Sequence, residues 1–190
     1  FFSKPVILRG RDLPTYPTNY FQVLSQIHQP EIDINKIASI IERDVSLSYK
    51  LLRLINSAAF YLREEINSIK HALVLLGIDE FKKWFSLIVL RDIGEDKTDE
   101  IIRLSMIRAK FAELIAEKIG LREERSEFFL MGIFSMIDVL MNRKMEDILK
   151  ELPITNRIKW ALLGAEGRLK DVYQLILHYE QGEWESVSQK

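Results

Sequence analysis

Three histidines are the residues of this sequence best suited to bind a catalytic metal ion. His28, His71 and His178 lie far apart along the chain, and none is followed by the aspartate of a His-Asp pair. A metal-dependent hydrolase needs several imidazoles and carboxylates around one cation. Isolated histidines at helix edges are mostly packed or solvated, and no Ser-His-Asp or Cys-His pairing is supported by the spacing. The sequence therefore predicts no metal, no cofactor and no catalytic residue.

Two further groups of polar residues are candidates for a site. Ser135, Asp138 and Asn142 recur at i, i+3 and i+7 within an apolar stretch, which is typical of a pocket floor or, more commonly, of groups that satisfy neighbouring helix ends. Lys82 and Lys83 precede a tryptophan, and such a basic-aromatic surface suits a nucleotide or an acidic partner. The commoner interpretation is that these lysines are solvated and that the tryptophan is in the core.

The composition excludes several classes of protein. The 190 residues are 47% hydrophobic and 29% charged, enough for one sizeable core or two small lobes. Lys and Arg number 27 against 28 Asp and Glu, without the basic excess of a nucleic-acid-binding protein. No apolar run reaches the ~18 residues of a membrane span. The absence of cysteine excludes disulfides and thiolate metal sites and fits a reducing compartment.

The hydrophobic periodicity predicts an all-α fold. The clearest helix follows Asp44, a good N-cap, and repeats Leu47, Leu51 and Leu54 at helical spacing. Other helices are expected after Thr18 or Asn19, Asp33, Ser68, Asp79, Thr98 or Asp99, and Ser126, the last one continuing to Met141. The break at 94–97 predicts a compact bundle of two lobes, about 14–93 and 98–184, with a linker over 1–13 and a tail over 185–190.

The surroundings of the clearest helix resemble the signature of the HDOD domain family. The signature combines an acidic-Arg-Asp turn, a Leu-Leu-Arg step and an Asn-Ser-Ala-x-Phe ending. These features are found in Ile40–Asp44, Lys50–Arg53 and Asn56–Phe60, and Ile66–Gly77 and Lys82–Leu90 are similar to the segments that follow. The resemblance covers essentially all of the chain after Leu13 and implies an HDOD domain over 14–184 with the fold of HD phosphohydrolases.

The same resemblance implies that the metal site has been lost. Where an HD enzyme reads Gly-Leu-Leu-His-Asp-Ile, this chain reads Gly132 to Ile137 as Gly-Ile-Phe-Ser-Met-Ile. Ser135 thus stands in the histidine position and Met136 in the aspartate position. A hydroxyl is a poor ligand for a divalent cation and a thioether is a worse one for a hard metal.

Both ends of the chain resemble parts of EAL–HDOD proteins. Phe1–Pro5 is similar to the tail of an EAL domain, the cyclic di-GMP phosphodiesterase fold, as it leads into an HDOD domain. Similarities near the other end are found in Leu152-Pro153, Ala161–Gly164, Glu166-Gly167 and Tyr179–Trp184. The resemblance implies a fragment of a bacterial cytoplasmic signalling protein whose upstream part is an EAL domain.

We therefore expect a non-catalytic module that binds another signalling protein or the upstream EAL domain, with a homodimer left open and no nucleic acid. The candidate contact residues are Lys50, Arg53, Asn56, Lys82 and Lys83. Arg53 and Asn56 have a structural alternative, which is to tie helix ends or the loop after Phe60 to the core.

Two rival functions remain open from the sequence. One is an atypical HD-type metal-dependent phosphohydrolase built from Asp138, His71 and acidic residues such as Glu166. The other is a ligand sensor with an apolar cavity between the lobes, near Phe134, Met136 and Trp160.

Overall fold

The computed structural model describes residues 18–57, 60, 65–94 and 99–185, so the predicted linker over 1–13 lies outside the described residues. Every regular element within these ranges is a helix, which confirms the all-α prediction. The elements are α1 (Thr18–Ile27), α2 (Ile34–Glu42), α3 (Val45–Ile55), α4 (Ile69–Leu76), α5 (Ile78–Ile93), α6 (Asp99–Lys118), the 3-10 turn η2 (Arg122–Glu124), α7 (Arg125–Phe134), α8 (Ile137–Met141), α9 (Met145–Glu151), α10 (Asn156–Leu162) and α11 (Arg168–Gln181). None of them is both long and apolar enough to cross a lipid bilayer.

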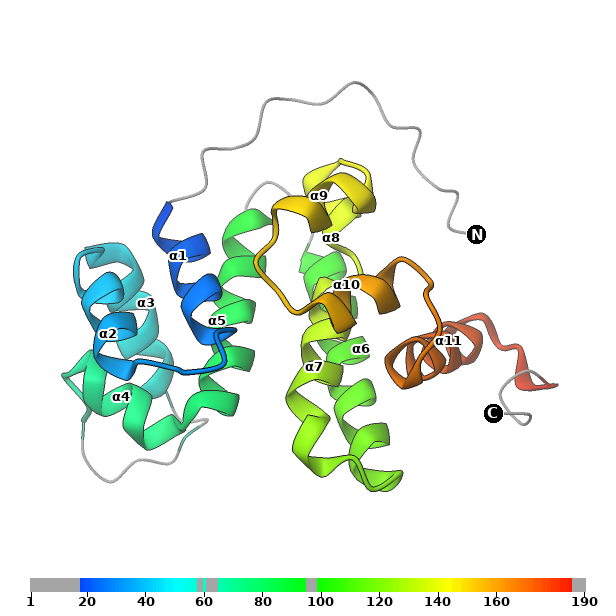
Figure 1. Ribbon diagram of the computed structural model, residues 1–190, viewed down its shortest axis with the longest axis horizontal. Coiled ribbons are helices and arrows are strands. Elements are labelled where there is room, and N and C mark those ends of the chain that lie inside the picture. The colour runs from blue at the N-terminus through cyan, green and yellow to red at the C-terminus, as the bar shows by residue number, and fades with distance from the viewer. Residues whose placement is uncertain (1–17, 58–59, 61–64, 95–98, 186–190) are drawn as a thin grey trace.

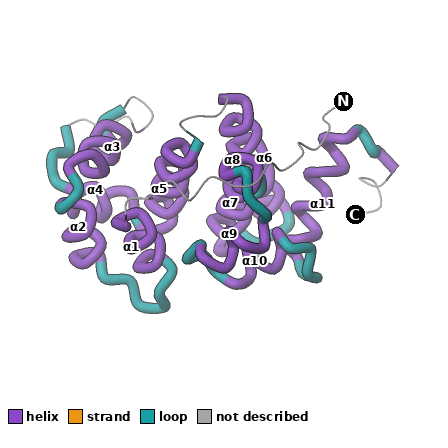
Figure 2. Tube along the Cα trace, turned by 90° about the horizontal axis from the view of Figure 1, so that it is seen from above, coloured by secondary structure: helices purple, strands orange, loops and turns teal. Residues whose placement is uncertain are grey.

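The helices form two groups that share one core. Helices α1–α5 gather on one side and α6–α11 on the other, with α5 packed against α7 at the junction (Figures 1 and 2). The main cluster of buried apolar side chains continues from Tyr20 in α1 to Ile176 in α11, and a smaller cluster gathers Ile55, Ile66 and Ala72. Because the core is continuous, the two predicted lobes are held together by burial of apolar surface.

Several helix ends form where the sequence predicts them. The side chains of Asp33, Asp44 and Ser68 accept hydrogen bonds from backbone N–H groups in the first turns of α2, α3 and α4. Asp79 does not cap a helix as predicted, because α5 begins one residue before it, at Ile78. Gly77, with a φ of 71°, ends α4 and directly precedes α5. The single residue between the two helices leaves Asp79 in the first turn, where its negative charge suits the helix dipole.

The apolar stretch 126–141 is two helices instead of the one predicted. Ser135 closes α7, because its N–H donates to the carbonyl of Gly132, three residues earlier, at 3.2 Å and its hydroxyl donates to the same oxygen at 2.7 Å. Met136, with a φ of −122°, then leaves the helical region before α8 begins. Asn142 ends α8 in the left-handed conformation, so the predicted polar stripe is divided between two helix ends.

Helices α6 and α7 form the most extensive helix pair of the described structure, and they cross at Gly132. A Cβ atom built on Gly132 would lie only 2.4 Å from both Cα and N of Ala109. The two backbones approach too closely for any side chain at this position. This crossing brings Arg108, the neighbour of Ala109, beside the end of α7.

Candidate functional site

A largely buried arginine lies beside the serine that stands in the HD histidine position. Arg108 of α6 donates from Nη1 to Oγ of Ser135, at 3.3 Å. Its other nitrogens bind Glu180 of α11, with Nε–Oε1 at 2.9 Å and Nη2–Oε2 at 2.7 Å. The Arg108 side chain is 11% exposed and that of Glu180 is 26% exposed. The guanidinium therefore connects α6, the end of α7 and the last turns of α11.

Burial shifts the pKa values of Arg108 and of its neighbours. Burial would lower the pKa of Arg108, but the hydrogen bonds and the charge of Glu180 outweigh it and raise that pKa. Burial raises the pKa of Asp138 in α8 above its usual value, against opposing bonds from backbone N–H groups and the charge of Arg108. Burial likewise raises the pKa of Tyr173 in α11. Arg108 is always positive, and Glu180 is its ion-pair partner.

A guanidinium at this place is unfavourable for a divalent cation. Two positive charges in a partly buried site repel each other more strongly than in water. The hydroxyl of Ser135 donates to the carbonyl of Gly132 and accepts from Arg108, so it already takes part in two hydrogen bonds. The arrangement fits a structural role in which the positively charged side chain of Arg108 holds α6, α7 and α11 together.

The residues of the rival phosphohydrolase lie on separate elements. His71 is exposed in α4, Asp138 is half-buried in α8, and Glu166 is exposed before α11, where it pairs with Lys170 at 2.6 Å. Within the described ranges, no three His, Asp or Glu side chains are close enough together to hold a metal ion. The structure therefore does not bring these three residues into one site.

Lys50, predicted as a contact residue, belongs to an internal network between three helices. Its Nζ lies 2.6 Å from Oδ2 of Asp92 in α5. The hydroxyl of Tyr20 in α1 donates to the same carboxylate oxygen. Burial, together with Asp92, raises the pKa of Tyr20. These bonds connect α3 to α1 and α5, while the Lys50 side chain stays 38% exposed.

Asn56 and Arg53, from the same predicted contact group, have different surroundings. Asn56 donates from Nδ2 to the carbonyl of Ile66 at 2.7 Å and accepts from the N–H of Ile66 at 2.8 Å. This pairing is the structural alternative predicted for Asn56, because it ties the segment after α3 to the helix end. Arg53 is exposed on α3.

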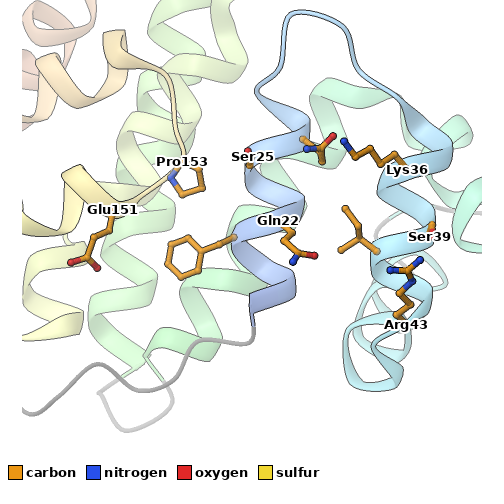
Figure 3. Close-up of a pocket in the computed structure, with 10 residues that line it drawn as sticks. Gln22, Ser25, Lys36, Ser39, Arg43, Glu151 and Pro153 are labelled. Carbon is orange, nitrogen blue, oxygen red and sulfur yellow. The ribbon is translucent and has the colours of Figure 1, made fainter.

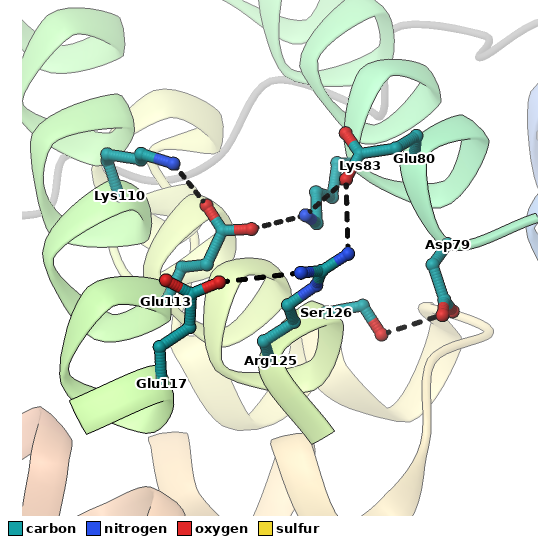
Figure 4. A network of polar contacts seen from close by, with 8 residues as sticks. All are labelled: Asp79, Glu80, Lys83, Lys110, Glu113, Glu117, Arg125 and Ser126. Carbon is teal, nitrogen blue, oxygen red and sulfur yellow. Dashed lines mark hydrogen bonds and ion pairs between the residues drawn. The ribbon is translucent and has the colours of Figure 1, made fainter. Parts of the chain in front are cut away.

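Lys83 differs from its expected surface position. Its side chain is 6% exposed and pairs with Glu113 of α6 and, at 2.7 Å, with Glu80 of its own helix. Figure 4 shows this network between α5 and α6, which Lys110 extends with a 2.8 Å bond to Glu113. Because Lys83 is buried and paired, a partner cannot reach it, whereas the adjacent Lys82 is half-buried.

The buried carboxylate of this network is held in its charged form. Burial alone would raise the pKa of Glu113, but hydrogen bonds from Lys110 and Lys83 and their charges lower it below the usual 4.5. The Nζ of Lys83 also lies 5.7 Å from the centre of the Phe129 ring in α7, a cation–π distance. The network therefore fixes α5 against α6 and α7.

The cavity expected near Phe134, Met136 and Trp160 is not formed by these residues together. Phe134 is completely buried, whereas Trp160 is 57% exposed and lines a surface pocket with α11 residues. A small cavity of about 20 Å³ does lie between the two groups of helices, next to Tyr20, Val89 and Ile137. Its volume is suited to a water molecule and not to an organic ligand.

Comparison with known proteins places the chain in a family. A model of the HDOD domain matches residues 13–169. The chain belongs to the HDOD domain family. A crystal structure of an HDOD domain protein of unknown function from Geobacter sulfurreducens has the same fold, with a TM-score of 0.58, 19% identity, and coverage of 90% of this chain and 61% of that one.

Two curated proteins align with this HDOD chain over its whole length. YuxH, an uncharacterised protein of Bacillus subtilis (strain 168), is 36% identical over 192 residues, which is 100% of this chain and 47% of YuxH. CdgJ of Vibrio cholerae serotype O1, named as a cyclic di-GMP phosphodiesterase, is 34% identical over 189 residues, 100% of this chain and 44% of CdgJ. The chain thus spans less than half the length of both relatives.

The residues that organise the site were not singled out from the sequence. The apolar spacing of the helix predicted after Asp99 places Ile107 or Arg108 on its buried side, and in the structure Arg108 turns inward while Ile107 is 49% exposed. Glu180, 72 residues away, carries no comparable signal. Glu113 and Asp92 likewise sit in ordinary charged surroundings in the sequence, although each forms a central ion pair.

Proposed function

We propose that this HDOD chain is a non-catalytic module of signal transduction that binds a protein partner or a neighbouring domain. The observation that carries the proposal is the position of Arg108, whose guanidinium contacts Ser135 and pairs with Glu180. A permanent positive charge beside the HD position opposes binding of the divalent cation that an HD hydrolase requires. A domain without such a cation acts through its surface.

Signal transfer of this kind needs no chemical step. A partner that binds one arrangement of the domain more tightly than another shifts the population toward that arrangement. The helix groups α1–α5 and α6–α11 meet along α5, whose polar network to α6 sets how they pack. A change of that packing is one way in which the state of a neighbouring domain reaches the bound partner.

We further propose that the chain is the C-terminal, cytoplasmic part of a bacterial EAL–HDOD protein in cyclic di-GMP signalling. The support is the likeness of Phe1–Pro5 to the end of an EAL domain. It is strengthened by the alignment with CdgJ, a named cyclic di-GMP phosphodiesterase that is more than twice as long as this chain. The sequence upstream of Phe1 in the gene tests this proposal directly, and an upstream domain of another family would contradict it.

We propose that two of the five predicted contact residues, Arg53 and Lys82, contact the partner directly. Arg53 is exposed and Lys82 is half-buried at the surface of α5. Lys50, Asn56 and Lys83 act through the fold, because each is held by another part of the chain.

A metal and turnover assay tests the absence of catalysis. The purified full chain is titrated with Mn²⁺ by calorimetry and incubated with bis(para-nitrophenyl) phosphate in the presence of Mn²⁺ or Mg²⁺. We expect no saturable binding and no turnover above that of the Asp138→Ala variant, which controls for a contaminating hydrolase. Metal-dependent turnover in the unmodified chain that disappears in Asp138→Ala would overturn the proposal.

A further inference from the structure

A broad surface groove crosses α1. It has a volume of about 750 Å³. Helix α1 forms its floor, α2 forms one wall and the segment after α9 forms the other (Figure 3). Phe21, Ile40 and Pro153 supply its apolar surface, and Gln22 and Ser39 are among the polar side chains around it. The groove is wide and open, which suits a segment of polypeptide better than a small ion.

The wall formed by α2 and its C-cap carries two basic side chains without an ion-pair partner among the described residues. Lys36 and Arg43 are both exposed, and Figure 3 shows Lys36 extending from α2 toward α1 and Arg43 lying along the end of α2. They are seven residues apart, about 10 Å along one face of the helix. Neither takes part in any ion pair of the described residues. The carboxylate of the opposite wall, Glu151, is already paired with Arg143 at 2.8 Å.

We propose that this α1–α2 groove binds an acidic, partly apolar peptide segment of a partner protein. Two carboxylates of the segment would meet Lys36 and Arg43, and its apolar side chains would cover Phe21 and Ile40. Charge complementarity of this kind sets specificity and speeds association. The inference rests on the proposed binding function and names the chemistry of the partner.

The charge of the groove disfavours the chain's own N-terminal segment as its occupant. Residues 1–17 lead directly into α1 and contain Lys4, Arg9 and Arg11 against the single acid Asp12. Their net positive charge has the same sign as Lys36 and Arg43, which would therefore repel them.

A peptide-binding experiment tests the groove. The full chain is titrated into a fluorescein-labelled helical peptide of Leu and Glu residues, about four turns long, and binding is measured by fluorescence anisotropy. A second peptide carries Lys in place of each Glu. We expect saturable binding of the acidic peptide that weakens with added salt, and no binding of the basic one.

Matched charge reversals locate the binding site. The double variant K36E/R43E is expected to bind the acidic peptide at least about tenfold more weakly, because two attractive charges become repulsive. The control K118E/R122E makes the same charge change at exposed residues on α6 and η2, away from the groove, and is expected to bind normally. Circular dichroism checks that both variants are folded.

Each outcome separates the groove from the broader function. Three results would overturn the groove proposal: no binding of the acidic peptide, equal binding of the basic peptide, or an equal loss of affinity in the two double variants. None of them bears on the proposal that the chain is not a catalyst. A dimer of the unmodified chain that becomes monomeric in K36E/R43E, measured by sedimentation, would show that a second copy occupies the groove and would also overturn it. Metal-dependent turnover would instead contradict the proposed function alone.

Discussion

Replacing Gly132 with alanine tests the packing that places Arg108 beside Ser135. The added Cβ would lie 2.4 Å from Cα and N of Ala109 and 2.7 Å from the carbonyl carbon of Arg108. Ordinary van der Waals contact begins at 3.4 Å, so α6 and α7 must separate by about 1 Å at their crossing. A gap of this size forfeits roughly a quarter to a half of the attraction between the facing atoms.

The expected change in the free energy of unfolding of Gly132→Ala is the difference between two opposing effects. Alanine is better than glycine inside a helix by about 1 kcal/mol. Overpacking typically costs about 1–3 kcal/mol when side chains can rotate away, and here the atoms that collide belong to the backbone. We therefore expect a gross cost of about 3–4 kcal/mol and a net loss of about 2–3 kcal/mol in the free energy of unfolding. For a domain of this size the melting temperature falls by roughly 5–10 °C.

Urea denaturation followed by far-UV circular dichroism measures this loss. Gly120→Ala is the control, because a Cβ there meets no atom within 4 Å but the φ of +83° strains the residue. It should cost only about 1 kcal/mol. Ala109→Gly should not rescue Gly132→Ala, since the atoms struck are Cα and N. A Gly132→Ala protein as stable as the unmodified chain, or rescue by Ala109→Gly, would refute the close backbone crossing.

Three further predictions concern the polar contacts. Asn56→Ala should lower the free energy of unfolding by about 2 kcal/mol in urea, because both backbone groups of Ile66 lose a partner; unchanged stability with lost partner binding would instead indicate a direct contact role. Glu113→Gln should destabilise the chain near neutral pH, because it leaves Lys83 without its buried carboxylate. The folded-state pKa of Glu113 is lowered, so its stabilisation is present above the usual value of 4.5 and is lost as the pH falls toward the folded pKa. The difference between variant and unmodified chain should therefore shrink below that pH, and a pH-independent difference would contradict the ion pair. Asp44→Ala should cost about 1 kcal/mol by removing the N-cap of α3, whereas Asp44→Asn should cost less, and equal losses in thermal unfolding would argue against capping.

The local structure of this protein is determined by its sequence. The N-caps Asp33, Asp44 and Ser68 and the 3.6-residue apolar repeat are short-range signals, and each acts within one or two turns of helix. The all-α fold follows from such signals. Helix boundaries that depend on one residue were less predictable, as the start of α5 at Ile78 and the division at Ser135 illustrate.

The partners of charged side chains were decided only by the tertiary structure. Lys83 and Lys82 are neighbours with the same local sequence signal, yet only Lys83 turns into the protein to meet Glu113, 30 residues away. Arg108 reaches Glu180 across 72 residues because α6 and α11 pack together in the fold. Burial and pairing of a charge depend on which helix faces lie against each other, and that information is not contained in the spacing of residues along the chain.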